Sequence, residues 1–232
     1  MPSVGGYLDG VLFGALPYVA VFTFLLVSIQ RYRGHPFTYS SLSSQFLENR
    51  QHFFGLVLFH YGVLFVLTGH VVAFFVPSWV LAWNSRPIRL YILEVSALVF
   101  GLLSLVGISL AIVRRFDVAK VRVVTSRADW VVVALLAFQV FSGVYVAIAH
   151  PWGSSWFSSI ATPYLWSLVA LAPDLQAVSA FPVWVKLHIV NAYLLVLLFP
   201  FTRLVHVLVV PNPYLWRRPQ VVRWYRRPTG AA

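Results

Sequence analysis

The feature that most limits how this chain can fold is a set of five apolar stretches, each long enough to cross a lipid bilayer as a helix. About 20 residues of α-helix span the roughly 30 Å hydrocarbon core of a bilayer. The five stretches lie at about residues 8–30, 53–76, 90–113, 128–149 and 183–210. Lipid offers the backbone no hydrogen-bond partners, so such segments satisfy their own peptide groups as helices. The sequence therefore predicts an all-α, integral membrane bundle of five transmembrane helices.

The composition supports one membrane domain rather than a soluble globule. Hydrophobic residues make up 60% of the 232 residues and charged residues only 10%, too few to cover a soluble protein of this size. We expect residues 1–232 to form a single transmembrane domain with a short basic tail at about 211–232. Because MPSVGGYLDG has no basic residue before the first apolar stretch, we expect that stretch to remain as a helix rather than to be removed as a signal peptide.

The basic residues are divided unevenly between the two sides that alternating spans create. Fourteen of the 17 fall on one side: Arg31, Arg33, Arg50, Arg114, Arg115, Lys120, Arg122, Arg127, Arg203, Arg217, Arg218, Arg223, Arg226 and Arg227. The other side receives Arg86, Arg89 and Lys186. The positive-inside rule places the larger group in the cytoplasm, which predicts an outward N-terminus and a cytoplasmic C-terminus. This distribution explains the net charge of +11 by membrane topology rather than by nucleic-acid binding.

Four histidines stand inside two of the predicted helices, and this pattern favours a metal cofactor. His60 and His70 lie in FHYGVLFVLTGH, and His188 and His206 lie in KLHIVNAYLLVLLFPFTRLVH. Ionisable side chains are costly inside a membrane, and two bis-histidine haems require four neutral imidazoles. Cysteine is absent, so disulfides, cysteine-ligated iron–sulfur clusters and a CxxCH haem attachment are excluded within this chain.

Helical geometry predicts how the four histidines pair. At 100° per residue, His188 and His206 are five whole turns apart, and His60 and His70 are about 80° apart. The two helices run antiparallel in the predicted topology, so His60 pairs with His206 on the cytoplasmic side and His70 with His188 outside. Two stacked haems would then connect the two sides. Along the helix axes, His60 and His70 are about 15 Å apart and His188 and His206 about 27 Å apart. We expect a bend at Pro200 to absorb the difference.

Several other residues carry weaker signals. A single histidine near a helix end is usually interfacial or hydrogen-bonded, and we favour that interpretation for His35, His52 and His150. Small residues in the third helix predict close helix packing: Ser96, Gly101, Ser104 and Gly107. Asp129 stands at the start of the fourth helix, either as its N-terminal cap or as a haem-edge partner. Aromatic residues in the link at about 150–182 predict a segment in the membrane interface: Trp152, Trp156, Tyr164 and Trp166.

The sequences LFHYGVLFVLTGH and KLHIVNAYLLVLLFPFTRLVH, with SSQ in the first cytoplasmic link, strongly resemble the gamma subunit of respiratory nitrate reductase. The resemblance covers nearly the whole chain. It implies that the pairs His60 with His206 and His70 with His188 ligate two b haems. It further implies a multi-pass protein of a prokaryotic cytoplasmic (inner) membrane that oxidises quinol from the quinone pool near the outer haem. Electrons would pass to a cytoplasmic iron–sulfur subunit and a molybdenum catalytic subunit, where nitrate is reduced.

The quinol site implied by the resemblance lies at the outer end of the second and third helices. Gly69 would let a quinol ring approach the backbone, and the second ring nitrogen of His70 would hydrogen-bond toward the pocket. Glu94 is a candidate proton acceptor, with a carboxylate that simply reaches water as the alternative. The candidate catalytic residues are Gly69, His70, Arg86, Arg89 and Glu94.

Two further positions bear on cofactor and substrate contacts. Arg203, three residues before His206, suits a haem propionate as a planar charged donor, and an arginine that reaches the membrane surface is the alternative. Family members can carry a lysine shortly after the second helix, where this chain has Tyr91 with two arginines nearby.

Two other functions fit the same residues. The first is a related cytochrome b subunit of a heterodisulfide-reductase-like or sulfite-reductase-associated complex. The second is a haem-free transporter or assembly subunit whose histidines relay protons or pack. The sequence also leaves open whether the substrate is menaquinol or ubiquinol.

Overall fold

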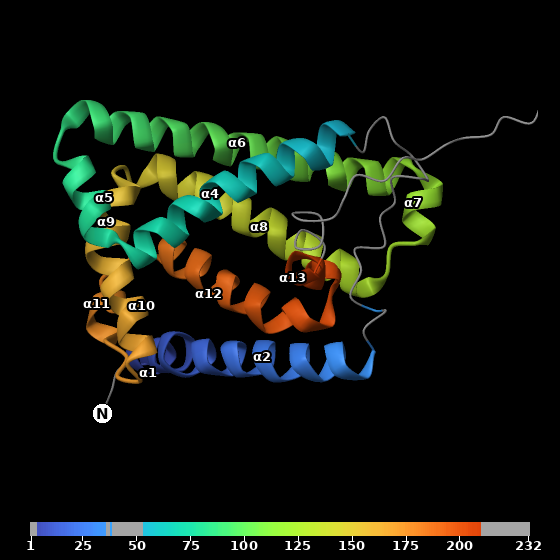
Figure 1. The fold of residues 1–232 in the computed structure, drawn as a ribbon, viewed down its shortest axis with the longest axis horizontal. Coiled ribbons are helices and arrows are strands. Elements are labelled where there is room, and N and C mark those ends of the chain that lie inside the picture. Colours follow the sequence, from blue (N-terminus) through green and yellow to red (C-terminus); the bar gives the residue numbers. More distant parts are fainter. Residues whose placement is uncertain (1–3, 36–37, 39–52, 210–232) are drawn as a thin grey trace, which may run out of the picture.

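The computed structural model describes residues 4–35, 38 and 53–209, and long helices lying side by side dominate these ranges (Figure 1). Five helices are long and apolar enough to cross a membrane: Gly5–Gly34, Phe54–Phe75, Pro87–Asp117, Arg127–Ala149 and Val183–Phe201. No strand occurs within the described ranges. The predicted all-α bundle of five spans is confirmed, and the side that each terminus faces stays a prediction.

The spans are joined by short helices that gather at the two ends of the bundle (Figure 1). The spans consist of α1 (Val4–Asp9) continued by α2 (Leu16–Gly34), α4 (Leu58–Phe75), α6 (Pro87–Asp117), α8 (Arg127–Ala149) and α12 (Val183–Leu198). The joining helices are α5 (Pro77–Asn84), α7 (Ala119–Val123), α9 (Gly153–Trp156), α10 (Thr162–Val169) and α11 (Leu175–Ser179). A further short helix, α13 (His206–Val209), follows the last span and lies between α4 and α2 in Figure 1. Wider π-helical turns cover Gly10–Ala15, Phe53–Val57 and Phe157–Ala161, and 3₁₀ turns cover Phe199–Phe201 and Arg203–Val205. The predicted basic tail and most of the first cytoplasmic link lie outside the described residues.

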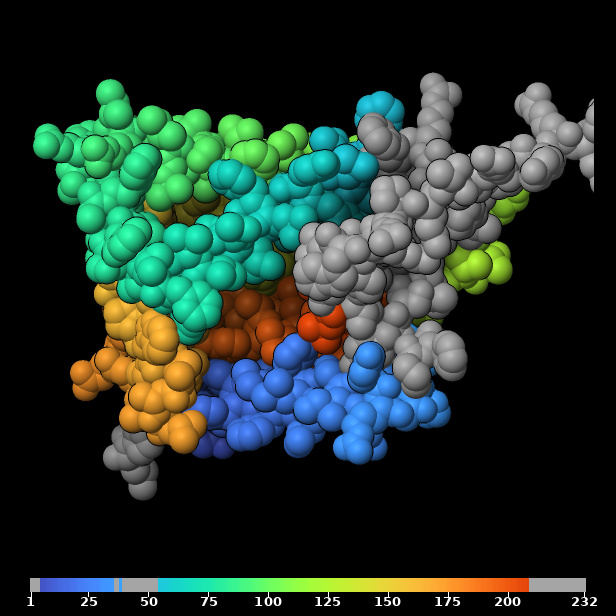
Figure 2. Space-filling view, viewed as in Figure 1, coloured from blue at the N-terminus to red at the C-terminus, as the bar shows by residue number. Residues whose placement is uncertain are grey.

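The spans pack in the spatial order α2, α12, α8, α6 and α4. Figure 2 shows α12 set back between α4 and α2 on the face that it draws. The α4–α6 pair is especially close, since a Cβ added at Gly62 would lie 2.6 Å from the carbonyl oxygen of Phe100. A Cβ added at Gly107 would lie 2.7 Å from the carbonyl oxygen of Gly55. The predicted close packing of the third span through its small residues is confirmed.

The segment between α8 and α12 closes one end of the bundle. Thr162 Oγ1 donates to the carbonyl of Ala73 at 3.2 Å, and the Trp166 ring stacks on Phe74 with ring centres 5.0 Å apart. Trp152 and Trp166 are exposed, as the predicted interfacial segment requires. Tyr164 differs, because it is only 1% exposed and belongs to the core. The segment is therefore a packed part of the bundle with some aromatic residues at its surface.

Candidate functional site

The last span is shorter than the sequence predicts, and its end shapes the candidate site. The predicted helix over 183–210 breaks after α12, and Thr202 is extended, with φ −123° and ψ 179°. Pro200 causes the break, because it lacks an N–H and its ring obstructs the preceding turn. A new turn begins at Thr202, whose Oγ1 accepts from the backbone N–H of Leu204 at 3.3 Å. Since His188 and His206 do not share one helix, the predicted alignment over five whole turns is wrong, and the predicted bend at Pro200 is confirmed.

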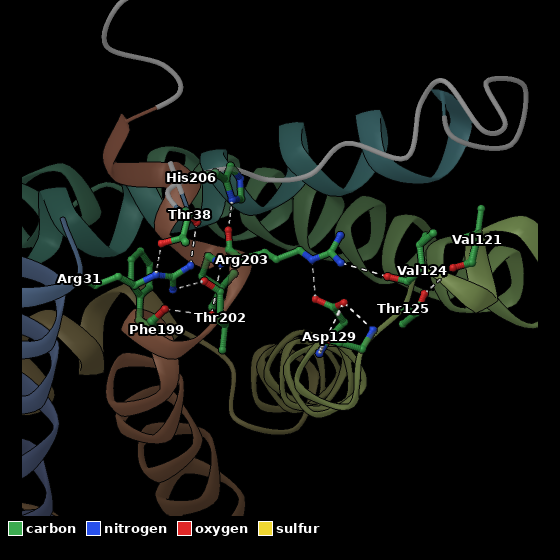
Figure 3. Close-up of polar contacts among 12 residues, drawn as sticks. Arg31, Thr38, Val121, Val124, Thr125, Asp129, Phe199, Thr202, Arg203 and His206 are labelled. Carbon is green, nitrogen blue, oxygen red and sulfur yellow. Dashed lines mark hydrogen bonds and ion pairs between the residues drawn. The ribbon is translucent and has the colours of Figure 1, made fainter. Parts of the chain in front are cut away.

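An arginine from another span holds the broken end of α12. Arg31 Nη1 donates to the carbonyl of Pro200 at 2.6 Å and to the carbonyl of Thr202 at 3.2 Å (Figure 3). A helix end leaves carbonyl groups without partners, and a guanidinium supplies several donors in a fixed plane. Arg31 therefore ties α2 to the turn that leads into His206.

A second contact holds the same turn from α8. Arg203 Nε lies 2.9 Å from Asp129 Oδ1, and Arg203 Nη2 donates to the carbonyl of Val124 at 3.1 Å (Figure 3). Ser126 is the N-cap of the fourth span, and Asp129, at the N3 position, completes a capping box with it, so the predicted N-terminal cap is Ser126 rather than Asp129. The Arg203 guanidinium is thus used within the protein, and its predicted contact with a haem propionate stays a prediction.

The turn brings His206 to His60, as the antiparallel arrangement predicts. Their ring centres are 6.3 Å apart, with the ring planes at 67°. Two imidazoles that each place a nitrogen about 2 Å from one metal ion, on opposite sides, have ring centres about 6 Å apart. The separation therefore fits axial ligation of one metal between the two rings.

The protonation of three histidines also suits metal binding. His60 Nδ1 lies 2.7 Å from the carbonyl of Leu56, His70 Nδ1 lies 2.8 Å from that of Val66, and His206 Nδ1 lies 2.7 Å from that of Arg203. A carbonyl only accepts hydrogen bonds, so each Nδ1 carries the hydrogen. In the neutral ring Nε2 then keeps a lone pair, which is the form that binds metal.

His188, on α12, is held by side chains of α8. Its Nδ1 lies 2.9 Å from Ser142 Oγ, and its Nε2 lies 3.1 Å from Gln139 Nε2. His70, its predicted partner, has its ring edge against Phe157, with ring centres 5.0 Å apart. Within the described residues no ring contact joins His70 to His188, so this pair is less closely assembled than the His60–His206 pair.

The structure places the candidate quinol residues at the end of the bundle formed by α5, α9 and the start of α6. Glu94 Oε1 accepts from both the backbone N–H of Ser154, at 2.8 Å, and its hydroxyl, at 2.6 Å. The carboxylate therefore fastens α9 to α6 rather than standing free in water. Arg89 lies over the Trp83 ring at 5.3 Å and shares a shallow hollow with it. Gly69 faces open space, since an added Cβ would meet nothing within 4 Å, and Arg86 is exposed.

The remaining histidines stand apart from these pairs. His35 and His150 directly follow α2 and α8 as their C-terminal caps, and His52 lies outside the described residues. Within the described part of the chain no group of three or more histidine, cysteine, aspartate or glutamate residues could hold a metal ion. Any metal there would rest on pairs of side chains and on ligands from a cofactor, as in a bis-histidine haem.

Comparison with known proteins decides the family. The sequence pattern of the nitrate reductase gamma subunit matches residues 9–225. This chain belongs to the nitrate reductase gamma subunit family. It is 31% identical to the nitrate reductase gamma chain of Bacillus subtilis (strain 168) over 216 residues, covering 92% of this chain and 97% of that one. It is also 31% identical to the respiratory nitrate reductase 1 gamma chain of Escherichia coli (strain K12) over 227 residues, 94% of this chain and 98% of that one.

A more distant relative contains the same region within a longer protein. The nitrate reductase-like protein NarX of Mycobacterium tuberculosis (strain ATCC 25618 / H37Rv) is 28% identical over 218 residues, 92% of this chain but 33% of that one. The predicted family is confirmed. This gamma subunit is a multi-pass membrane subunit of a nitrate reductase, an oxidoreductase complex whose catalytic activity lies in another subunit.

Some polar residues around the histidines were not among the predicted site residues. Gln139 and Ser142 on α8 and Asn191 on α12 form a hydrogen-bonded group around His188. A signal was present in the sequence, because amide side chains are rare in membrane-spanning helices and usually face another polar group. Arg31 carried no such signal, since an arginine at the end of a span also satisfies the positive-inside rule.

Proposed function

We propose that this gamma subunit binds two b haems, oxidises quinol at its outer end and passes the electrons to cytoplasmic partner subunits. The observation that carries the proposal is the His60–His206 pair, with ring centres 6.3 Å apart and both Nδ1 atoms bonded to carbonyl groups. A relay of protons or simple packing does not require two rings from distant parts of the chain to lie 6.3 Å apart with each Nδ1 bonded to a carbonyl group.

The four histidines would hold the two haem irons through Nε2, His60 with His206 and His70 with His188. A bound b haem supplies one-electron transfer. The residues of this chain set the geometry around it. Arg31 and the Arg203–Asp129 ion pair fix the turn that carries His206, and the carbonyl of Arg203 orients the His206 ring. Hydrogen bonds of this kind keep a ligand ring in one tautomer and one orientation.

Quinol oxidation releases two electrons and two protons, so the outer end needs a proton acceptor with access to water. Glu94 is the acceptor that we propose, through Oε2, because its Oε1 already accepts two hydrogen bonds from Ser154. The open space at Gly69 leaves room for a quinol ring beside His70. Arg86 and Arg89 would favour release of the protons by stabilising negative charge on the quinol oxygens.

The partners that we propose are a cytoplasmic iron–sulfur subunit and a molybdenum catalytic subunit. They would dock on the basic end of the bundle, near α7, which carries Lys120 and Arg122. The proposal includes the predicted topology, with the N-terminus outside and the C-terminus in the cytoplasm.

The test is a reduced-minus-oxidised optical spectrum with haem quantitation on the purified complex. Two b haems are expected in the wild type and one in each of His60→Ala and His70→Ala. The matched control is His150→Ala, which changes a histidine at the end of α8 and should keep both haems. Co-purification of molybdenum and iron–sulfur proteins, with quinol-dependent nitrate reduction, identifies the partners. A purified complex without haem would contradict the proposal and favour the alternative function of a haem-free transporter.

A further inference from the structure

We propose that Ser142 is a positioning residue that holds the ring of His188 in the tautomer and orientation needed for ligation. The inference rests on the proposed function, since it concerns one ligand of the outer haem. The other three histidines of the two pairs bond Nδ1 to a backbone carbonyl three or four residues earlier. His188 instead bonds to a side chain of a neighbouring span, at 2.9 Å. Its orientation therefore depends on the contact between two helices.

The direction of the hydrogen bond follows from the single hydrogen of a hydroxyl group. Ser142 Oγ donates to the carbonyl of Gln139 at 3.2 Å. Because a serine has one O–H hydrogen, its oxygen is then the acceptor toward His188. The tautomer with the hydrogen on His188 Nδ1 satisfies both contacts of Ser142, and Nε2 of the neutral ring then keeps its lone pair. Ser142 thus gives His188 the same metal-binding form that backbone carbonyls give the other three.

The surroundings of Ser142 show that α8 is shaped to receive this ring. Ser142 is fully buried, and the next residue is a glycine. A Cβ added at Gly143 would lie 3.0 Å from His188 Cε1, closer than side-chain atoms normally approach. The Ser142 hydroxyl and the absence of a side chain at Gly143 together define the position of the His188 ring.

Gln139 contacts both ring nitrogens of His188. Gln139 Nε2 lies 3.1 Å from His188 Nε2 and 3.3 Å from His188 Nδ1, and its Oε1 accepts from Asn191 Nδ2 at 2.7 Å. An amide nitrogen only donates, so with the hydrogen on Nδ1 the shorter contact is a hydrogen bond to Nε2 of His188. Ligation through Nε2 replaces the Gln139 contact and leaves the Ser142 contact in place. Ser142 is for this reason the residue that would still hydrogen-bond His188 Nδ1 when Nε2 binds the metal.

A hydrogen bond from Nδ1 increases the basicity of an imidazole ligand. A more basic ligand stabilises ferric iron relative to ferrous iron, so loss of this bond should raise the reduction potential of one haem only. Ser142→Ala removes the acceptor. Ser142→Cys keeps a weak acceptor of similar size, and Ser142→Thr keeps the hydroxyl.

The experiment is a redox titration of the two haems in membranes containing the assembled complex, followed by optical and electron paramagnetic resonance spectra. The signal of the outer haem is identified as the one lost in His188→Ala. In Ser142→Ala that signal should move to higher potential and the other should not, with Ser142→Cys between it and the wild type and Ser142→Thr near the wild type. The control is Ser158→Ala, which removes another buried hydroxyl, one that bonds to the carbonyl of Ser154 at 2.7 Å.

The outcomes separate the two proposals. If the complex with Ser142→Ala does not assemble, Ser142→Cys provides the test, and its outer-haem reduction potential should be higher than that of the wild type. Two haems with unchanged potentials and spectra in Ser142→Ala and Ser142→Cys would overturn the role of Ser142 and leave the proposed function standing. A wild-type complex without haem would overturn both.

Discussion

The hydroxyl of Tyr164 lies 2.8 Å from the backbone carbonyl oxygen of Phe13. In an α-helix that carbonyl would accept from the N–H of residue 17, and Pro17 has none. The π-helical turn over Gly10–Ala15 stands just before this proline, so the first span continues through it with its orphaned carbonyl satisfied by α10. The contact is buried, since Tyr164 and Phe13 are each 1% exposed. It joins the first span to the helices that close one end of the bundle.

Replacing Tyr164 with phenylalanine should destabilise the protein, because the Phe13 carbonyl would be buried without its donor. An unsatisfied buried polar group costs about 1–3 kcal/mol. We expect a lower thermal unfolding temperature for Tyr164→Phe, measured on the purified chain in detergent. Tyr7→Phe is the matched control, because Tyr7 is 66% exposed and its loss of a hydroxyl should leave the transition unchanged. Equal transitions in the two variants would contradict the role of the Tyr164 contact.

The same residue predicts a dependence of stability on alkaline pH. Burial raises the pKa of Tyr164 from 10.0 to about 12. Below pH 10 the phenol is protonated in both native and unfolded chains, so its contribution to stability is full. Between about pH 10 and 12 the unfolded chain releases the proton while the native chain keeps it, and the free energy of unfolding falls as pH rises. In chemical unfolding experiments between about pH 10 and 12, the free energy of unfolding should fall less steeply with pH in Tyr164→Phe than in the wild type. The same pH dependence in both proteins would contradict the raised pKa of Tyr164.

The sequence predicted the spans and one histidine pair because these depend on simple physical rules. Span length follows from bilayer thickness, and the meeting of His60 with His206 follows from antiparallel helices. The break after α12 was only half predicted. Pro200 marked the place of a bend, but the turn back toward α4 depends on Arg31 and on the Arg203–Asp129 pair. Contacts between residues so far apart in sequence leave no local pattern.

The end of the bundle around Glu94 was harder to predict for a different reason. Glu94 stands in an apolar span, where a carboxylate suggests proton chemistry, but the structure gives it a partner from α9. Ser154 offered no signal of its own, since serine is common in loops and at helix starts. Tyr164 looked like an interfacial aromatic residue, but it is buried in an apolar cluster with Phe13 and its hydroxyl donates to the Phe13 carbonyl. In both cases the partner residue decides the environment.

The close α4–α6 contact should make Gly107 sensitive to substitution. A Cβ there would meet the backbone of Phe59 in α4, with Cα at 2.8 Å, and the carbonyl oxygen of Gly55 in the preceding π-helical turn, at 2.7 Å. Backbone cannot move aside as a flexible side chain can. Overpacking typically costs about 1–3 kcal/mol. We expect Gly107→Ala to lower the thermal unfolding temperature and the yield of folded protein. Gly10→Ala should do neither, because a Cβ at that position meets nothing within 4 Å. Normal stability of Gly107→Ala would mean that the two helices separate easily.

Loss of Arg31 should disturb the His60–His206 pair without changing either histidine. Arg31→Met removes the donors to the carbonyls of Pro200 and Thr202, and hydrogen bonds from charged groups contribute about 1.5–3 kcal/mol each. The turn that carries His206 would then lose its tie to α2, so the haem that we propose between His60 and His206 should be bound less fully or show a changed spectrum. The measurement is haem content per chain with a low-temperature optical spectrum. Arg33→Met is the matched control, since Arg33 lies exposed in the same last turn of α2. Equal haem content and identical spectra in the two variants would show that the turn keeps its shape through the Arg203–Asp129 pair alone.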